Sequence, residues 1–172
     1  MELTNDRELN SYVLQYFKER KIDLRDLAEV VLELQHEYMP KLTVEECEMA
    51  INQVLGKREV LFHIATGIQL DKLAKAKKLD FPLQEAVSND YGLFSVDETL
   101  ALGLTYPYGA IAMTSFGYLD RVKHSTAKRL DEEQRKHHGK IVNTFLDDIV
   151  SAIIADAAAL IAHNENEFVE DE

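Results

Sequence analysis

The sequence is poor in residues that cross-link or interrupt a chain, with one cysteine, three prolines, seven glycines and no tryptophan among 172 residues. A single cysteine cannot build a disulfide framework, so Cys47, at an apolar position of a helical pattern, is expected to be a buried thiol in a reducing compartment. The first residues lack the basic and apolar segments of a signal peptide, which favours a cytoplasmic protein. We find no repeats and no strand-like alternation, so the composition favours a helical globule.

Positive charge is also scarce. The chain has 19 Lys and Arg residues against 31 Asp and Glu residues, a formal net charge of −12. Such a field repels the phosphates of nucleic acids and anionic lipid surfaces, so we expect no nucleic-acid partner. A phosphorylated ligand would need local positive charge, which bound cations can supply to an acidic protein.

One apolar run needs a membrane test. The segment from Thr99 to Leu119 has no formal charge and is as long as a bilayer-spanning helix, which needs about 20 residues. It is interrupted by Pro107 and Gly109 and contains several hydroxyl-bearing side chains, which is untypical of a lipid-facing helix. We therefore expect a buried helix pair, divided or kinked near Pro107, and no stable membrane insertion.

Apolar residues recur at helical spacing along most of the chain. The pattern predicts a helix over residues 9–17, a second over 24–38 that ends before Pro40, and a third that opens with a capping box at Thr43 and Glu46. The third helix is expected to continue to residue 64, with a break at Gly67. Further helices are predicted over residues 68–79, 83–88, within 95–119 and over 144–163.

These elements predict an all-α fold, a compact single domain of six to eight helices around a central apolar helix. The domain is expected to span residues 1–163, followed by an acidic tail over 164–172. The last helix is rich in alanine, which lets neighbouring helices approach closely and favours a homo-oligomer.

Acidic residues lie beside apolar sequence at three places: Asp97-Glu98, Asp120 and Asp147-Asp148. Carboxylates gathered from different helices can hold Mg²⁺ or a similar hard cation, leaving positions open for water or phosphate. The alternative is structural: Ser95 with Glu98, and Thr144 with Asp147, have capping-box spacing, so two of these acids could stabilise helix ends.

The sequence blocks around these acids resemble one known family. The blocks are Val96-Asp97-Glu98-Thr99, Leu119-Asp120-Arg121-Val122-Lys123, and Gly139-Lys140 leading to residues 145–152, Phe-Leu-Asp-Asp-Ile-Val-Ser-Ala. Their order and spacing are similar to the Asp-Glu, Asp-x-x-Lys and Asp-Asp-Ile-Val-x-Ala motifs of the phosphatidylglycerophosphatase A family. The chain resembles its soluble Gram-positive bacterial branch most, and there the similarity extends to residues 64–71.

The resemblance implies a compact helical protein that removes phosphate from phosphatidylglycerophosphate, or from a related phosphomonoester, with Mg²⁺ as cofactor. It also implies roles for individual residues. The implied metal ligands are Asp97, Glu98, Asp120, Asp147 and Asp148. Among these, catalytic roles are expected for Asp97, Glu98 and Asp148, and phosphate contacts for Lys123 and Lys140.

Two other classes of function remain open at this point. The chain could be a non-catalytic protein that binds metal or a phosphorylated ligand with the same acids, or an interaction protein whose acids are helix caps. Convergence of the acids in space, with metal between them, would exclude the reading in which they are only helix caps, and would leave the phosphatase and the non-catalytic binding protein.

Overall fold

The computed structural model describes residues 5–137 and 139–169, and within them the chain forms nine α-helices, one short 3-10 helix and no strand. The elements in order are α1 (Asp6–Glu19), α2 (Leu24–Gln35), α3 (Val44–Val54), α4 (Arg58–Lys75), α5 (Leu83–Asn89), α6 (Val96–Thr105), η1 (Tyr106–Tyr108), α7 (Gly109–Val122), α8 (Ser125–His137) and α9 (Leu146–Val169).

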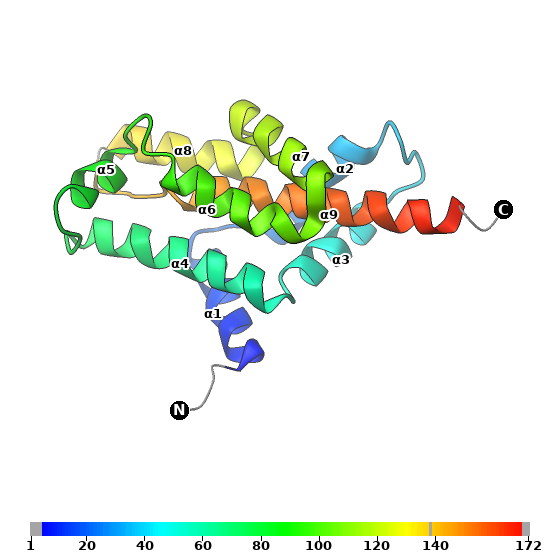
Figure 1. Ribbon diagram of the computed structural model, residues 1–172, viewed down its shortest axis with the longest axis horizontal. Coiled ribbons are helices and arrows are strands. Elements are labelled where there is room, and N and C mark those ends of the chain that lie inside the picture. The colour runs from blue at the N-terminus through cyan, green and yellow to red at the C-terminus, as the bar shows by residue number, and fades with distance from the viewer. Residues whose placement is uncertain (1–4, 138, 170–172) are drawn as a thin grey trace.

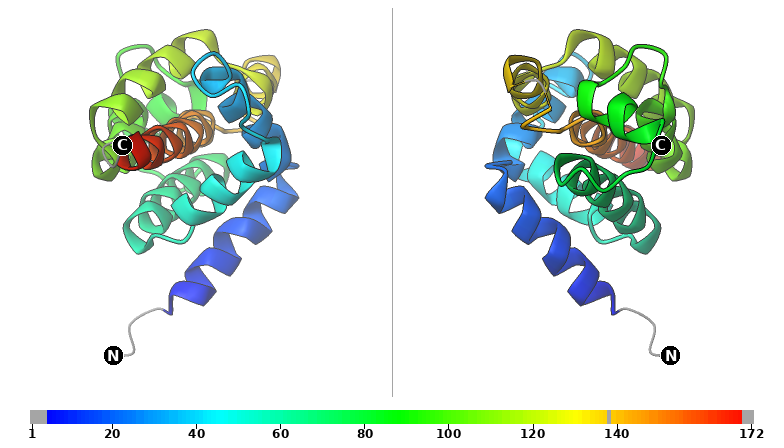
Figure 2. Two further views of the ribbon diagram at one scale, coloured as in Figure 1. Left: turned by 90° about the vertical axis from the view of Figure 1, so that its right-hand side faces the viewer. Right: turned by 90° about the vertical axis from the view of Figure 1, so that its left-hand side faces the viewer.

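Helix α9 is the centre of the molecule. Every residue from Leu146 to Ala159 is buried, including the polar ones, and α2, α3, α4, α6, α7 and α8 all contact this helix. Figure 1 shows α9 running along the long axis, and Figure 2 shows it nearly end-on with the other helices around it. A helix that is apolar on all sides is stable only when surrounded. The all-α fold around a central apolar helix is therefore confirmed.

The charge-free run divides as predicted. Helix α6 ends at Thr105, the 3-10 helix η1 contains Pro107, and α7 starts at Gly109, whose φ of 75° is readily adopted by glycine. Across the described part of the chain, no helix has the combination of length and apolar character needed to cross a membrane.

Several predicted helix boundaries were wrong. Helix α2 ends at Gln35, before Tyr38, and the predicted third helix is two helices that meet at Gly56 and Lys57. Gly67 does not break a helix but lies inside α4, facing α9. A Cβ atom at this position would lie 2.4 Å from Ile149 Cδ1, so glycine is needed there for close helix packing and not for a turn.

The two ends of the chain differ in how they pack. Helix α1 lies at the edge of the molecule, against α4, and points away from the rest in Figure 2. At the other end α9 continues to Val169, so most of the segment expected to be a tail is helical; residues 170–172 lie outside the described part.

Candidate functional site

All five predicted acids line one cavity of about 320 Å³. They come from three helix ends: the first turn of α6, the last turn of α7 and the first turn of α9. Figure 1 shows that α6 and α9 begin at the same end of the molecule. The full lining is Asp90, Tyr91, Gly92, Leu93, Ser95, Asp97, Glu98, Asp120, Lys123, Arg135, Thr144, Asp147 and Asp148.

The start of α9 is fixed by Asp71, a buried residue of α4. Its carboxylate accepts hydrogen bonds from the backbone N–H of Phe145, at 3.2 Å, and of Leu146, at 3.1 Å. These donors have no partner inside the helix, so Asp71 acts as the cap of α9 from another helix. The residues that it holds directly precede Asp147 and Asp148, and Asp71 therefore positions two acids of the cavity.

Asp71 was not predicted as a site residue, although its position in the sequence carries a signal. Asp71 follows Ile64 and Ile68 on the same helical stripe, and both isoleucines are buried. An acid on an apolar stripe must find a buried partner, and here the partner is the start of α9.

Lys123 lies between the acids. Its ammonium nitrogen is 2.5 Å from Asp147 Oδ2, 3.3 Å from Asp148 Oδ1 and 3.3 Å from Asp120 Oδ1. Only 23% of the side chain is exposed, and the neighbouring carboxylates raise the Lys123 pKa far above its ordinary value despite burial. One positive charge therefore compensates three carboxyl groups.

Three acids of the cavity have raised pKa values, mainly because they are buried. Burial raises the pKa of Asp148, and the neighbouring Asp147 raises it further. Burial also raises the pKa of Asp147, against the lowering effect of Lys123, and it raises the pKa of Asp97. A cation entering the cavity would stabilise the ionised form of all three.

The lining fits a hard divalent cation in its chemistry. Carboxylate oxygens are the ligands that Mg²⁺ prefers in proteins, and the buried Oδ1 of Asp97 has no hydrogen-bond partner among the described residues. Over the same residues, however, no group of three or more His, Cys, Asp or Glu side chains is arranged as a ready metal site. The Lys123 ammonium lies where three of the carboxylates meet, so these acids would have to release it before they surrounded a metal.

The two predicted capping boxes of this region are absent. Ser95 has a φ of 57° and its side chain makes no cap hydrogen bond to α6. The Thr144 hydroxyl accepts from Gln134 and donates to the backbone oxygen of Val87. Glu98 and Asp147 are therefore not explained as partners in capping boxes.

Other residues lie differently from the prediction, or were missed. Lys140 is exposed in the segment before α9 and does not line the cavity, whereas Lys123 does. Asp90 and Arg135 line the cavity without having been predicted. Asp90 lies in a turn-rich stretch and Arg135 on a charged helix face, where such residues are ordinary, so the sequence carried no signal for either.

One wall of the cavity has an unusual backbone. Asp90, Leu93 and Ser95 all have positive φ angles, of 50°, 70° and 57°, although none is glycine. Leu93 is also 99% exposed, so no packing of its side chain offsets this conformation. The segment 90–95 therefore carries backbone strain at the cavity wall.

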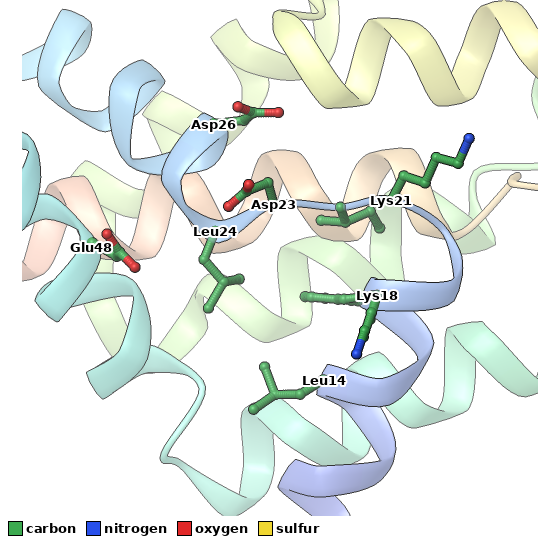
Figure 3. A pocket seen from close by; sticks show the side chains of 9 residues that line it. Leu14, Lys18, Lys21, Asp23, Leu24, Asp26 and Glu48 are labelled. Atoms are coloured by element: carbon green, nitrogen blue, oxygen red, sulfur yellow. The ribbon is translucent and has the colours of Figure 1, made fainter.

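A larger cavity, of about 580 Å³, lies between α1 and the start of α2. None of the predicted metal-binding, catalytic or phosphate-binding residues lines it. Figure 3 shows Leu14 and Leu24 facing each other across it, with Lys18, Lys21, Asp23, Asp26 and Glu48 around them. Charges of both signs are mixed along this lining, so it does not concentrate a field of one sign.

Another buried acid, Asp156, lies further along α9. Asp156 is fully buried and neither carboxylate oxygen has a hydrogen-bond partner within the described residues. Burial raises its pKa to about 8, with Lys57 acting in the lowering direction. Asp156 does not line the acidic cavity.

The fold and the cavity together define a class: an all-α protein whose central helix presents paired acids, beside a lysine, to an open cavity. The family model of Phosphatidylglycerophosphatase A matches residues 24–163. The chain belongs to this family, and the resemblance inferred from the sequence is confirmed.

Relatives of the chain are similar to it in sequence and in structure over most of their length. The chain is 47% identical over 146 residues to the uncharacterized protein YutG of Bacillus subtilis (strain 168), covering 85% of this chain and 86% of that protein. The crystal structure of the low temperature requirement C protein from Listeria monocytogenes superposes with a TM-score of 0.85 at 44% identity, covering 92% of this chain and 97% of that one. The crystal structure of YpjQ from Bacillus subtilis gives a TM-score of 0.88 at 37% identity, covering 96% and 99%.

Proposed function

We propose that the chain is a divalent-metal-dependent phosphatase, similar to phosphatidylglycerophosphatase, that hydrolyses a phosphomonoester of a lipid headgroup or of a small molecule. The observation that carries the proposal is the convergence of acids from α6, α7 and α9 on one open cavity beside Lys123. Membership of the phosphatidylglycerophosphatase A family supports the same reaction class.

In this proposal the five acids hold Mg²⁺, which when bound would neutralise phosphate charge and help to generate a nucleophile from water. Asp97, Glu98 and Asp148 contact the reacting groups. Lys123 leaves its position among the carboxylates and donates hydrogen bonds to the phosphate oxygens as a point charge. The lysine would thus stabilise the empty cavity and bind the phosphate in the occupied one.

The test is phosphate release from phosphatidylglycerophosphate in detergent micelles and from a panel of soluble phosphomonoesters, with and without Mg²⁺. We expect release that requires Mg²⁺ and falls roughly 100-fold or more in Asp148→Asn, because this side chain is assigned a catalytic contact. Asn has nearly the same shape as Asp148, whose raised pKa already favours the uncharged carboxyl group, so the variant is expected to fold, which circular dichroism will verify. Asp80→Asn, at an exposed site outside the cavity, is the matched control.

A second function is favoured by a specific observation. Lys123 already bridges three of the acids, and no ready group of metal ligands is present in the described ranges 5–137 and 139–169. This arrangement also fits a non-catalytic protein that binds a metal or phosphorylated ligand by exchanging it for the lysine. Mg²⁺ binding that Asp148→Asn abolishes, with no phosphate release from any substrate by the wild type, would establish this alternative and refute the phosphatase.

A further inference from the structure

A separate cavity of about 290 Å³ lies between α1, the C-terminal half of α4 and the segment that precedes α9. It shares no lining residue with the acidic cavity. Its volume is roughly ten times the ~30 Å³ that a water molecule occupies in the liquid, so a small anion fits. Its lining is Tyr16, Glu19, Arg20, Asp71, Lys72, Lys75, Ile141 and Val142.

The two lysines of this lining are not neutralised by carboxylates as Lys123 is. Within the described residues, neither Lys72 nor Lys75 forms an ion pair with a carboxylate. Arg20 donates from Nη2 to Asn143 Oδ1 at 2.6 Å and to Glu133 at 3.3 Å, but its buried Nε has no partner in the same part of the chain. Arg20 lines the cavity beside the two lysines, so its guanidinium adds a third positive group to this lining.

The Lys72 ammonium is held in place by aromatic rings and not by acids. It lies 4.5 Å from the centre of the Tyr16 ring and 4.9 Å from that of Tyr12, and it donates to the Tyr12 hydroxyl at 3.3 Å. Cation–π contacts fix the position of the ammonium without cancelling its charge. The positive charge is therefore preorganised toward an incoming anion.

The two acids of the lining oppose an anion only weakly. The Asp71 carboxylate is engaged by two backbone N–H groups at the start of α9, which partly neutralise it. Glu19 is exposed at the end of α1, where it accepts a hydrogen bond from Gln15, and water screens its charge. The three cations of the lining thus outnumber its two acids.

We propose that this cavity is a second ligand site, which binds a phosphate group through Arg20, Lys72 and Lys75. Arg20 supplies a planar donor, and the lysines supply point charges, the combination typical of phosphate sites. Asp71 lines this cavity and caps α9, so an anion here would lie beside the residue that positions Asp147 and Asp148. The site does not depend on the phosphatase proposal, because it shares no residue with the acidic cavity.

The test is titration of the ¹⁵N-labelled full chain with inorganic phosphate in the presence of EDTA, followed by NMR. We expect the amide signals of Lys72, Lys75 and Phe145 to shift together. Lys72→Gln is expected to weaken the binding about tenfold, since a hydrogen bond to a charged group is lost. Lys78→Gln removes the same charge from an exposed site outside the cavity and should leave the affinity unchanged.

Two further arms distinguish a soluble ligand from a lipid. Glycerol phosphate in solution and vesicles containing phosphatidic acid offer the same phosphomonoester, and the arm that loses binding in Lys72→Gln identifies the source. Equal weakening in Lys72→Gln and Lys78→Gln would overturn the proposal, because it would show only general attraction to charge. Shifts confined to residues 90–98 and 120–123, or no saturable binding of any probe, would overturn it as well.

Discussion

Asp71→Ala tests whether the start of α9 depends on a cap from another helix. The substitution removes the side-chain acceptor of two buried backbone N–H groups, those of Phe145 and Leu146. The Leu146 N–H also donates to the backbone oxygen of Asn143 at 3.0 Å, so within the described residues only the Phe145 donor is left without an acceptor. An unsatisfied donor costs about 1–3 kcal/mol. Removing a buried carboxyl group, whose pKa burial raises well above its ordinary value, offsets part of this cost. We expect a net loss of about 1–2 kcal/mol in the free energy of unfolding.

Urea unfolding followed by circular dichroism measures this loss, and thermal melting should show a fall of about 2–8 °C for a chain of this size. Asp71→Asn keeps one carbonyl oxygen and should lose less than Asp71→Ala. Asp26→Ala, at an exposed helical site, is the control and should change stability by no more than about 0.5 kcal/mol. If Asp71→Ala were as stable as this control, the assigned cap would be refuted.

Two further predictions concern buried positions of α9 and its neighbours. Asp156 has a pKa of about 8 in the fold against about 3.9 unfolded, so the folded state binds more protons and stability falls as pH rises from about 4 to 8. Asp156→Asn should remove this dependence, of at most ~1.4 kcal/mol per pH unit, in urea unfolding at several pH values; an unchanged slope would contradict it. Gly67→Ala, which puts a Cβ 2.4 Å from Ile149 Cδ1, should cost about 1–3 kcal/mol, whereas Gly117→Ala, with no atom within 4 Å, should stabilise by up to about 1 kcal/mol. Thermal melts that reversed this order would show that α4 and α9 do not pack so closely.

The elements that the sequence predicted well are those whose signal is local. The apolar spacing of α1 and the Thr43–Glu46 capping box depend on residues within a few positions of one another, and both occur in the structure. The division near Pro107 follows from proline geometry alone. Gly67 was misread because its role depends on α9, far away in the sequence, and glycine permits turns and close packing alike.

In the candidate site, too, contacts between residues far apart in the sequence could not be predicted. The sequence blocks indicated which acids to consider, and the structure gathers them around one cavity. That Lys123 bridges Asp120, Asp147 and Asp148 could not be read from spacing, since it depends on how α7 and α9 cross. The Ser95 capping box is absent because Ser95 takes up a left-handed backbone conformation and its side chain makes no cap hydrogen bond to α6.

Because α9 is both the core of the protein and the origin of Asp147 and Asp148, the cavity has a fixed floor and an adjustable wall. The floor cannot shift without disturbing the packing of most other helices. Adjustment to a ligand is therefore expected from Lys123 and from the strained segment 90–95. A ligand that binds to this floor must also oppose global unfolding, so its affinity should be measurable as a rise in the melting temperature of the whole chain.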